Sequence, residues 1–229
     1  MRYNHTGMEF TLFSQVRFQV RNPVALIECY CFQCDFYSRY DLVSNRKMED
    51  VNEIGARIDE VALRGCRSIV DRTGDLRIFR FDRSLDEFLQ LDDCTIGDYV
   101  QELHNTVILR LLKVPRIGLS KATKLLHTIY PGIIPMIDNM YQKGYCRAKK
   151  RSLTEHQSDE ILTDYYKNLK IGDNLQNLSV LHQQLQSSHL LGLTKVRIFD
   201  ILWWSYLKSE NVAVALRVNN PGFRWQVVA

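Results

Sequence analysis

Two helical patterns meet at a very short corner, and this corner limits the folds open to the chain. An apolar run over residues 107–112 stops at VPRIG, residues 114–118, and a new helical pattern starts at about Leu119. Pro115 fixes its own φ, and Gly118 admits backbone angles that other residues resist. The spacing therefore predicts two helices joined by a tight hairpin.

The segment after the corner has the periodicity of an amphipathic helix. Its predicted buried stripe comprises Ala122, Leu125, Leu126 and Ile129. Lys121, Lys124 and Thr128 fall on a different face, which we expect to point outward. The helix is predicted to end before the Pro131-Gly132 pair, because proline cannot continue a helix.

Most other segments also have helical periodicity. Helices are predicted over residues 24–37, 48–71 (as one helix or two), 84–91, 95–114, 158–171, 173–186 and 193–210. The first twenty residues alternate well enough for a short strand or hairpin, and residues 75–81 predict a further strand. We therefore expect a mainly α fold with a minor β element near the N-terminus.

The 229 residues are enough for one unit with a substantial core. We expect a single unit, or two interleaved helical lobes formed by residues 1–94 with the C-terminal helices and by residues 95–150. No apolar run approaches the ~20 residues of a membrane span, and the N-terminus lacks the apolar stretch of a secretory signal. These features predict a cytoplasmic protein without membrane contact.

Three of the six cysteines, Cys29, Cys31 and Cys34, form a cluster. A zinc site normally needs a second pair of ligands at a recognisable spacing, and none follows this cluster. Free thiols are therefore favoured over a metal site, and we expect neither a metal nor a cofactor.

Positive charge is concentrated around the corner. Residues 110–151 contain ten lysines and arginines and a single acid, Asp138, so this window carries +9 while the rest of the chain carries −5. A basic segment on an acidic body is typical of a surface that binds a polyanion. The alternative is a solvated face whose acidic partners come from elsewhere in the fold.

The corner itself offers a way to hold a phosphate. The first amides of a helix have no intrahelical acceptor, and the helix dipole is positive there, so they can point at a phosphate oxygen. A plain corner between two core helices is the alternative, but the local charge favours nucleic acid. The candidate DNA-binding residues are Lys113, Arg116, Ile117, Gly118, Ser120, Lys121 and Lys124.

Residues 114–145, VPRIGLSKATKLLHTIYPGIIPMIDNMYQKGY, resemble the helix-hairpin-helix DNA glycosylase superfamily. The family pattern has Pro, Gly, an apolar residue and Gly, then Ala, and an Asp sixteen residues beyond that Ala. Pro115, Ile117, Gly118 and Ala122 match this pattern, and Asp138 falls at the matching distance. Arg116 departs from it, because it stands where the family has its first Gly.

The resemblance implies a helix-hairpin-helix glycosylase-like fold and names the catalytic residue, Asp138. Family members that also cut the DNA strand carry a Schiff-base lysine two residues after the second Gly, and that position is Ser120 here. A serine there resembles the adenine-removing branch, which only hydrolyses the base. The ATKLLH string and VRIFDILWWSYL also resemble a poorly characterised bacterial family of glycosylase-like proteins, which implies a bacterial cytosol or nucleoid.

The chemistry of a lone carboxylate agrees with this implication. Breaking an N-glycosidic bond develops positive charge on the sugar, which a nearby carboxylate stabilises while it can also activate water. The alternative role for Asp138 is an N-cap of the helix that NMYQKGY predicts. The two roles are compatible.

A flipped base also needs a pocket with stacking partners. The candidates are Tyr40, Asp41, Tyr141 and Trp203. For the aromatic residues packing is favoured over a pocket role, and for Asp41 a turn is favoured. His127 is predicted to be a surface or packing histidine.

The leading hypothesis is a monofunctional DNA glycosylase that flips a damaged or modified base out of double-stranded DNA and leaves an abasic site. It would serve DNA repair or antiviral defence against phage with modified DNA. A catalytically silent helix-hairpin-helix DNA-binding module and a helical protein–protein adaptor are the alternatives, and no obligate protein partner is indicated.

Overall fold

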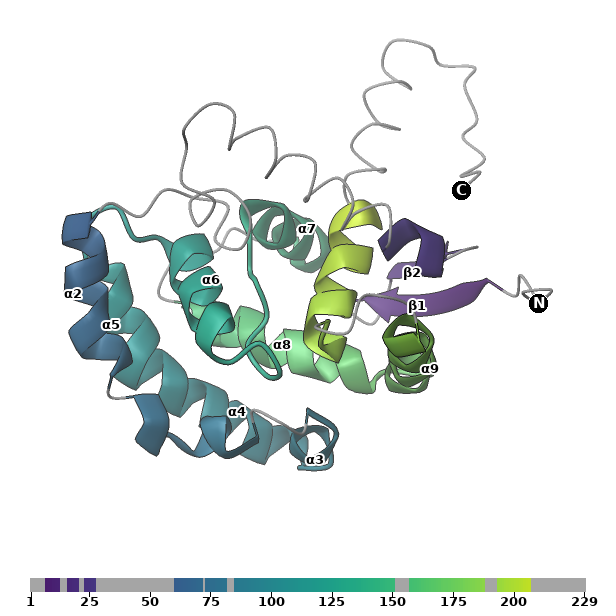
Figure 1. Cartoon of the computed structure of the whole chain (residues 1–229), viewed down its shortest axis with the longest axis horizontal. Coiled ribbons are helices and arrows are strands. Elements are labelled where there is room, and N and C mark those ends of the chain that lie inside the picture. Colours follow the sequence, from purple (N-terminus) through teal and green to yellow (C-terminus); the bar gives the residue numbers. More distant parts are fainter. Residues whose placement is uncertain are drawn as a thin grey trace, which may run out of the picture.

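The structure is a computed structural model that describes residues 7–12, 16–20, 23–27, 60–71, 73–81, 85–150, 157–187 and 193–206. These residues are mainly helical, with a small β element near the N-terminus, which confirms the prediction of a mainly α fold with a minor β element (Figure 1). Within them, no helix has both the length and the apolar character that a membrane crossing requires.

The β element is an antiparallel hairpin of β1 (Met8–Leu12) and β2 (Val16–Val20), with Met8 opposite Val20. Helix α9 (Asn174–Ser187) covers its edge. The side-chain amide of Asn174 accepts from the Thr11 amide at 2.8 Å and donates to the Thr11 carbonyl oxygen at 2.6 Å. One side chain therefore replaces the missing neighbouring strand and ties the hairpin to the helices.

The other elements are helical. They are α2 (Glu60–Val70), the 3₁₀ turns η2 (Thr73–Asp75) and η3 (Arg77–Phe81), α3 (Leu85–Leu89), α4 (Asp93–Leu103), the π-helical η4 (His104–Ile108), α5 (Leu109–Leu112), α6 (Leu119–Ile129), α7 (Asn139–Lys149) and α8 (Ser158–Lys170). Residues 23–27 and 195–206 are also helical. The last of these, helix 195–206, is the yellow-green helix of Figure 1, and the connection that leaves α6 runs between it and α6 in that view.

The strand predicted at residues 75–81 is wrong, because this stretch forms the 3₁₀ turns η2 and η3. Leu76 and Phe79 are both buried, and the Phe79 amide donates to the Leu76 carbonyl oxygen. The ring of Phe79 stacks on Tyr130, with centroids 3.7 Å apart. A three-residue spacing puts both apolar side chains on one side, which the alternation of a strand cannot do.

The helix predicted from Thr95 begins two residues earlier. Asp92 is its N-cap, and the Asp92 carboxylate accepts hydrogen bonds from the amide and the hydroxyl of Thr95 at 2.9 and 2.6 Å. The helix then passes through the π turn η4 into α5 and ends at Leu112. Asp92, four residues before the first buried apolar residue Ile96, is therefore the cap that sets the start of the helix.

The buried face of α6 is rotated from the predicted stripe. Ala122 and Leu126 are fully buried as predicted, but Ile129 is 42% exposed. Thr123 is fully buried instead, and its hydroxyl bonds both the Leu119 carbonyl oxygen and the Ile137 amide. Lys121 and Lys124, predicted to point outward, are half-buried. The rotation follows from residues 133–137, which pack on this face and whose Ile137 amide needs the Thr123 hydroxyl as an acceptor.

The turn at the corner places its one left-handed residue at Arg116, which has a φ of 66°. The Ile117 amide closes the turn by donating to the Val114 carbonyl oxygen at 3.1 Å. Gly118 is the N-cap of α6 in an extended conformation, with a φ of −99°. The expectation that Gly118 supplies unusual backbone angles is therefore wrong. The left-handed residue stands where the pattern of the resembling family has its first Gly.

We predict that Arg116→Gly gives a more stable protein than Arg116→Ala by about 1 kcal/mol, because only glycine occupies the left-handed region without steric cost. Both variants lose the same side chain, so the comparison isolates the backbone. Urea unfolding measures the difference. At Lys113, which has a φ of −79°, the order should reverse, and an alanine that equals glycine at residue 116 would contradict the assigned turn.

Candidate nucleic-acid interface and active site

A stretch without regular structure carries Asp138 to the start of α7. It leaves α6 through a turn in which the Ile133 and Ile134 amides donate to the Tyr130 carbonyl oxygen at 3.2 and 3.0 Å. Residues 133–137 run through the interior without regular secondary structure, and we call them the carrier segment. Ile133, Ile134 and Ile137 are fully buried.

Side chains from three helices satisfy the backbone of the carrier segment. A buried peptide group without a partner is costly, so these bonds hold the segment in place. The hydroxyl of Tyr166 donates to the Ile133 carbonyl oxygen (2.8 Å), His127 Nδ1 donates to the Ile134 carbonyl oxygen, the Met136 amide donates to Asp200 Oδ2 (3.0 Å), and the Ile137 amide donates to Thr123 Oγ1 (3.1 Å).

Asp138 follows the carrier segment and caps α7, as the sequence predicts. Its Oδ1 accepts a hydrogen bond from the Tyr141 amide at 2.7 Å, and its side chain is half-buried. Its neighbours contact the first turns of α6. The Ile137 amide reaches Thr123, and Asn139 Oδ1 accepts from the Ser120 hydroxyl at 3.2 Å. The carboxylate therefore lies beside the start of the helix that follows the corner.

Lys124 is a lysine of α6 whose pKa is affected by the Asp138 carboxylate. Burial lowers the pKa of the Lys124 ammonium, and the negative charge of Asp138 partly offsets that effect. Arg197, from helix 195–206, acts on Lys124 in the same direction as burial. Ser120 completes the group, because Gln142 of α7 donates to its hydroxyl at 3.2 Å. The structure thus brings together three residues singled out by sequence: Ser120, Lys124 and Asp138.

The rest of the predicted DNA-binding residues surround the corner with differing exposure. Lys113 and Arg116 are exposed, Gly118 and Lys121 are half-buried, and the Ile117 side chain is 4% exposed. Because the Ile117 amide is also used within the turn, this residue has little to offer a ligand. No side chain caps the N-terminus of α6, so its first amides have no side-chain acceptor.

Two of the four candidate pocket residues belong to the core. Tyr141 and Trp203 are 1% and 3% exposed, and their rings meet edge to face with centroids 5.0 Å apart. Both side chains therefore pack in the core rather than line a base pocket, which is the interpretation that the sequence analysis favoured. Tyr40 and Asp41 lie outside the described residues, as do Cys29, Cys31 and Cys34.

His127 is buried inside the protein, which is one of the two roles that the sequence predicted for it. Burial lowers the pKa of His127 to about 4, against a smaller opposing effect of its bond to the Ile134 carbonyl oxygen. Since a carbonyl oxygen only accepts, Nδ1 carries a hydrogen, and the lowered pKa favours the neutral ring at neutral pH.

Sequence reasoning missed Asp200. This residue of helix 195–206 is 5% exposed, and besides the Met136 amide it binds the Tyr165 hydroxyl, which lies 3.0 Å from its Oδ1. Burial raises the pKa of Asp200 to about 7, against the charge of Arg197 and these two hydrogen bonds, while Asp138 raises it further. An acid inside the apolar run VRIFDILWW was the available signal.

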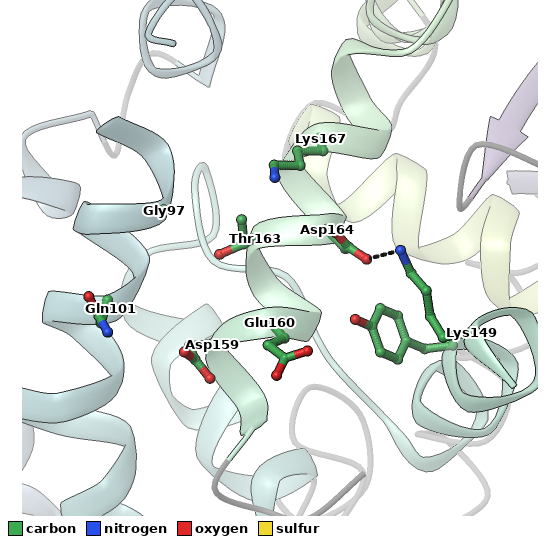
Figure 2. A pocket seen from close by; sticks show the side chains of 9 residues that line it. Gly97, Gln101, Lys149, Asp159, Glu160, Thr163, Asp164 and Lys167 are labelled. Atoms are coloured by element: carbon green, nitrogen blue, oxygen red, sulfur yellow. Dashed lines mark ion pairs between the residues drawn. The ribbon is translucent and has the colours of Figure 1, made fainter. Parts of the chain in front are cut away.

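An open pocket of about 430 Å³ lies elsewhere, between α4, α7 and α8. Figure 2 shows Gly97 and Gln101 on one side, the α8 residues on the other, and the Lys149–Asp164 ion pair, 2.6 Å long, at its margin. Three acids and two lysines line it: Asp159, Glu160, Asp164, Lys149 and Lys167. Asp138 is not among its lining residues, so this pocket is separate from the Asp138 site.

Comparisons with known proteins give no match: no family model, no curated protein and no solved structure was found to be similar to this chain. The functional interpretation therefore rests on the residues themselves and on the resemblance of residues 114–145.

We predict that Asp200→Asn gains stability relative to the wild type as the pH rises from 4 to 7. The folded protein keeps the Asp200 proton in this window while the unfolded chain loses it, so wild-type stability from this group falls as pH rises, on the order of a few kcal/mol in total. Asparagine does not titrate.

Urea unfolding of both proteins at several pH values measures this difference. His127 changes the free energy of unfolding in the opposite direction, but it does so equally in both proteins. A difference that is constant from pH 4 to 7 would show that Asp200 is ionised throughout.

Proposed function

We propose that this chain is a monofunctional DNA glycosylase with a helix-hairpin-helix glycosylase-like fold, and that Asp138 is its catalytic carboxylate. The observation that carries the proposal is the position of Asp138. Asp138 is the one acid of the 42-residue basic window at residues 110–151. It lies beside Ser120 and Lys124, which belong to α6, the helix that follows the corner.

The corner supports binding to the DNA backbone. The first amides of α6 have no side-chain cap, and Lys113, Arg116 and Lys121 surround them. Amides at a helix start and nearby cations are the groups that bind phosphate oxygens. Such contacts fix the register of the duplex without reading its sequence. Base selection would therefore depend on residues other than the corner.

The chemistry proposed for Asp138 needs a carboxylate that is ionised and held still. Its bond to the Tyr141 amide holds the carboxylate at the start of α7, where the positive end of the helix dipole lies. Placed against the sugar of a flipped nucleotide, it stabilises the positive charge that develops as the N-glycosidic bond breaks, and it orients the water that completes hydrolysis. The products are the free base and an abasic site.

Strand cleavage through a Schiff base is not part of the proposal. Ser120 occupies the position of the lysine in the resembling enzymes that cut DNA, and it has no amine. Lys121 is one residue further, about 100° around the helix, so its side chain starts from a different face. The cellular role would be repair, or defence against phage whose DNA carries modified bases.

A catalytically silent DNA-binding module is the second candidate. The burial of Tyr141 and Trp203 favours it, because these aromatic side chains pack on each other and leave no space between them for a base. The two candidates agree on the corner and differ on whether a nucleotide reaches Asp138.

We predict that the protein binds a duplex with a central pyrrolidine abasic analogue more tightly than one with a neutral tetrahydrofuran analogue. The pyrrolidine carries the positive charge that develops on the sugar, so the preference reports its attraction to Asp138. Asp138→Asn should reduce this preference about tenfold or more. Fluorescence anisotropy with both duplexes measures it.

Asparagine caps helices as well as aspartate does, so Asp138→Asn should keep its melting temperature and its affinity for the tetrahydrofuran duplex. Incubation with duplexes that contain damaged or modified bases, followed by detection of abasic sites, tests turnover directly. A wild type that binds DNA with no preference and yields no abasic sites would establish the silent module instead.

We predict that Lys113→Gln and Lys121→Gln each reduce the slope of log Kd against log salt by about 0.9, the value for one lost phosphate contact. Titration of a plain duplex at several salt concentrations measures the slope. Lys167→Gln, in the separate pocket, is the matched control and should leave it unchanged. Equal slopes for all three variants and the wild type would remove the corner from the interface.

A further inference from the structure

Met136 links two buried or half-buried carboxylates through its own backbone. Its amide donates to Asp200 Oδ2 at 3.0 Å, and its carbonyl oxygen accepts from the Asp138 amide at 3.1 Å. Its sulfur accepts a hydrogen bond from Arg197 at 3.5 Å, and Arg197 lies one turn before Asp200 on the same helix. Helix 195–206 therefore bonds two atoms of Met136, the amide nitrogen and the sulfur, while the carbonyl oxygen of the same residue bonds Asp138.

An ionised carboxylate at Asp200 lowers the stability of the fold, because burial opposes its ionisation. A neutral side chain of similar size would satisfy an ordinary core position. The charged groups that act on Asp200 are Arg197, which favours ionisation, and Asp138, which opposes it. The Met136 backbone thus bonds Asp200 and also the residue whose charge opposes the ionisation of Asp200.

The last turn before Asp138 depends on this contact. Pro135 has no amide hydrogen, so it cannot help to hold the segment. The Met136 amide is therefore the first donor after Pro135, and it bonds Asp200, while the next amide, that of Ile137, bonds Thr123. Thr194 supports the same arrangement, because its hydroxyl donates to the Pro131 carbonyl oxygen at 2.7 Å and accepts from the Arg197 amide at 3.2 Å.

We propose that Asp200 is a positioning residue for Asp138: by accepting the Met136 amide, it fixes the turn that aims the Asp138 carboxylate at the sugar. This inference rests on the proposed function for its consequence. The position itself can be tested without it. The competing explanation is that Asp200 only satisfies the buried Tyr165 hydroxyl, in which case Met136 would gain nothing from it.

The test compares three substitutions. Asp200→Leu removes the acceptor and retains bulk, Asp200→Asn retains an acceptor oxygen for the Met136 amide, and Tyr165→Phe removes the other partner of Asp200. Asp200→Ala is made as a second acceptor-free variant in case leucine does not fold. The first readout is the preference for the pyrrolidine over the tetrahydrofuran duplex. The second is hydrogen exchange of the Asp138 amide, which bonds Met136 and not Asp200.

Asp200→Leu or Asp200→Ala should reduce the pyrrolidine preference about 10- to 100-fold, since small displacements of a catalytic group have effects of this size. Affinity for the tetrahydrofuran duplex should stay within about twofold, because the phosphate contacts are made at the corner. Asp200→Asn and Tyr165→Phe should stay within about threefold of the wild type in the preference. Exchange at Asp138 should accelerate only in the acceptor-free variants.

The two proposals fail in different ways. A wild type without any pyrrolidine preference overturns the proposed function, and exchange at Asp138 then decides the role of Asp200 alone. Unchanged exchange at Asp138 in the acceptor-free variants, or a loss of preference as large in Tyr165→Phe as in Asp200→Leu, would overturn the positioning role.

Discussion

The backbone of the carrier segment is bonded by side chains rather than by a neighbouring strand, and the candidate site depends on this. Tyr166, His127, Asp200 and Thr123 each satisfy one peptide group of residues 133–137. Because these side chains come from α6, α8 and helix 195–206, the segment can keep its course only when all three helices are in place. The location of Asp138 is therefore a property of the whole helical body, although the residue itself caps a local helix.

The corner and the carboxylate are coupled through α6. The turn at residues 114–118 fixes where α6 starts, and the first turn of α6 carries the uncapped amides and the half-buried Lys121. The same helix contacts the residues on both sides of Asp138 through Thr123 and Ser120. A ligand held at the start of α6 would consequently lie at a fixed distance from Asp138. This rigid relation is what a binding step must supply to a chemical step.

Local signals predicted the fold class, most helices and the cap at Asp138, because helical periodicity and capping are encoded within a few residues. Three of the features that sequence analysis missed depend on contacts distant in sequence. Residues 75–81 form 3₁₀ turns because Phe79 stacks on Tyr130. Thr123 turns inward because the Ile137 amide needs an acceptor, and Asp200 matters because Met136 comes to lie against it. The glycine at the corner was recognised, but its neighbour Arg116 has the left-handed conformation.

His127 and Asp200 both bond the carrier segment, and burial shifts their pKa values in opposite directions. Burial lowers the pKa of His127 to about 4 and raises the pKa of Asp200 to about 7. At mildly acidic pH the folded chain therefore carries one proton on Asp200, whereas the unfolded chain carries one on His127. The count is equal on both sides of the transition, so acidification neither drives nor resists unfolding through this pair. Each of the two groups alone would make the stability of the carrier segment depend on pH, and between about pH 4 and 6.5 their opposite shifts offset each other.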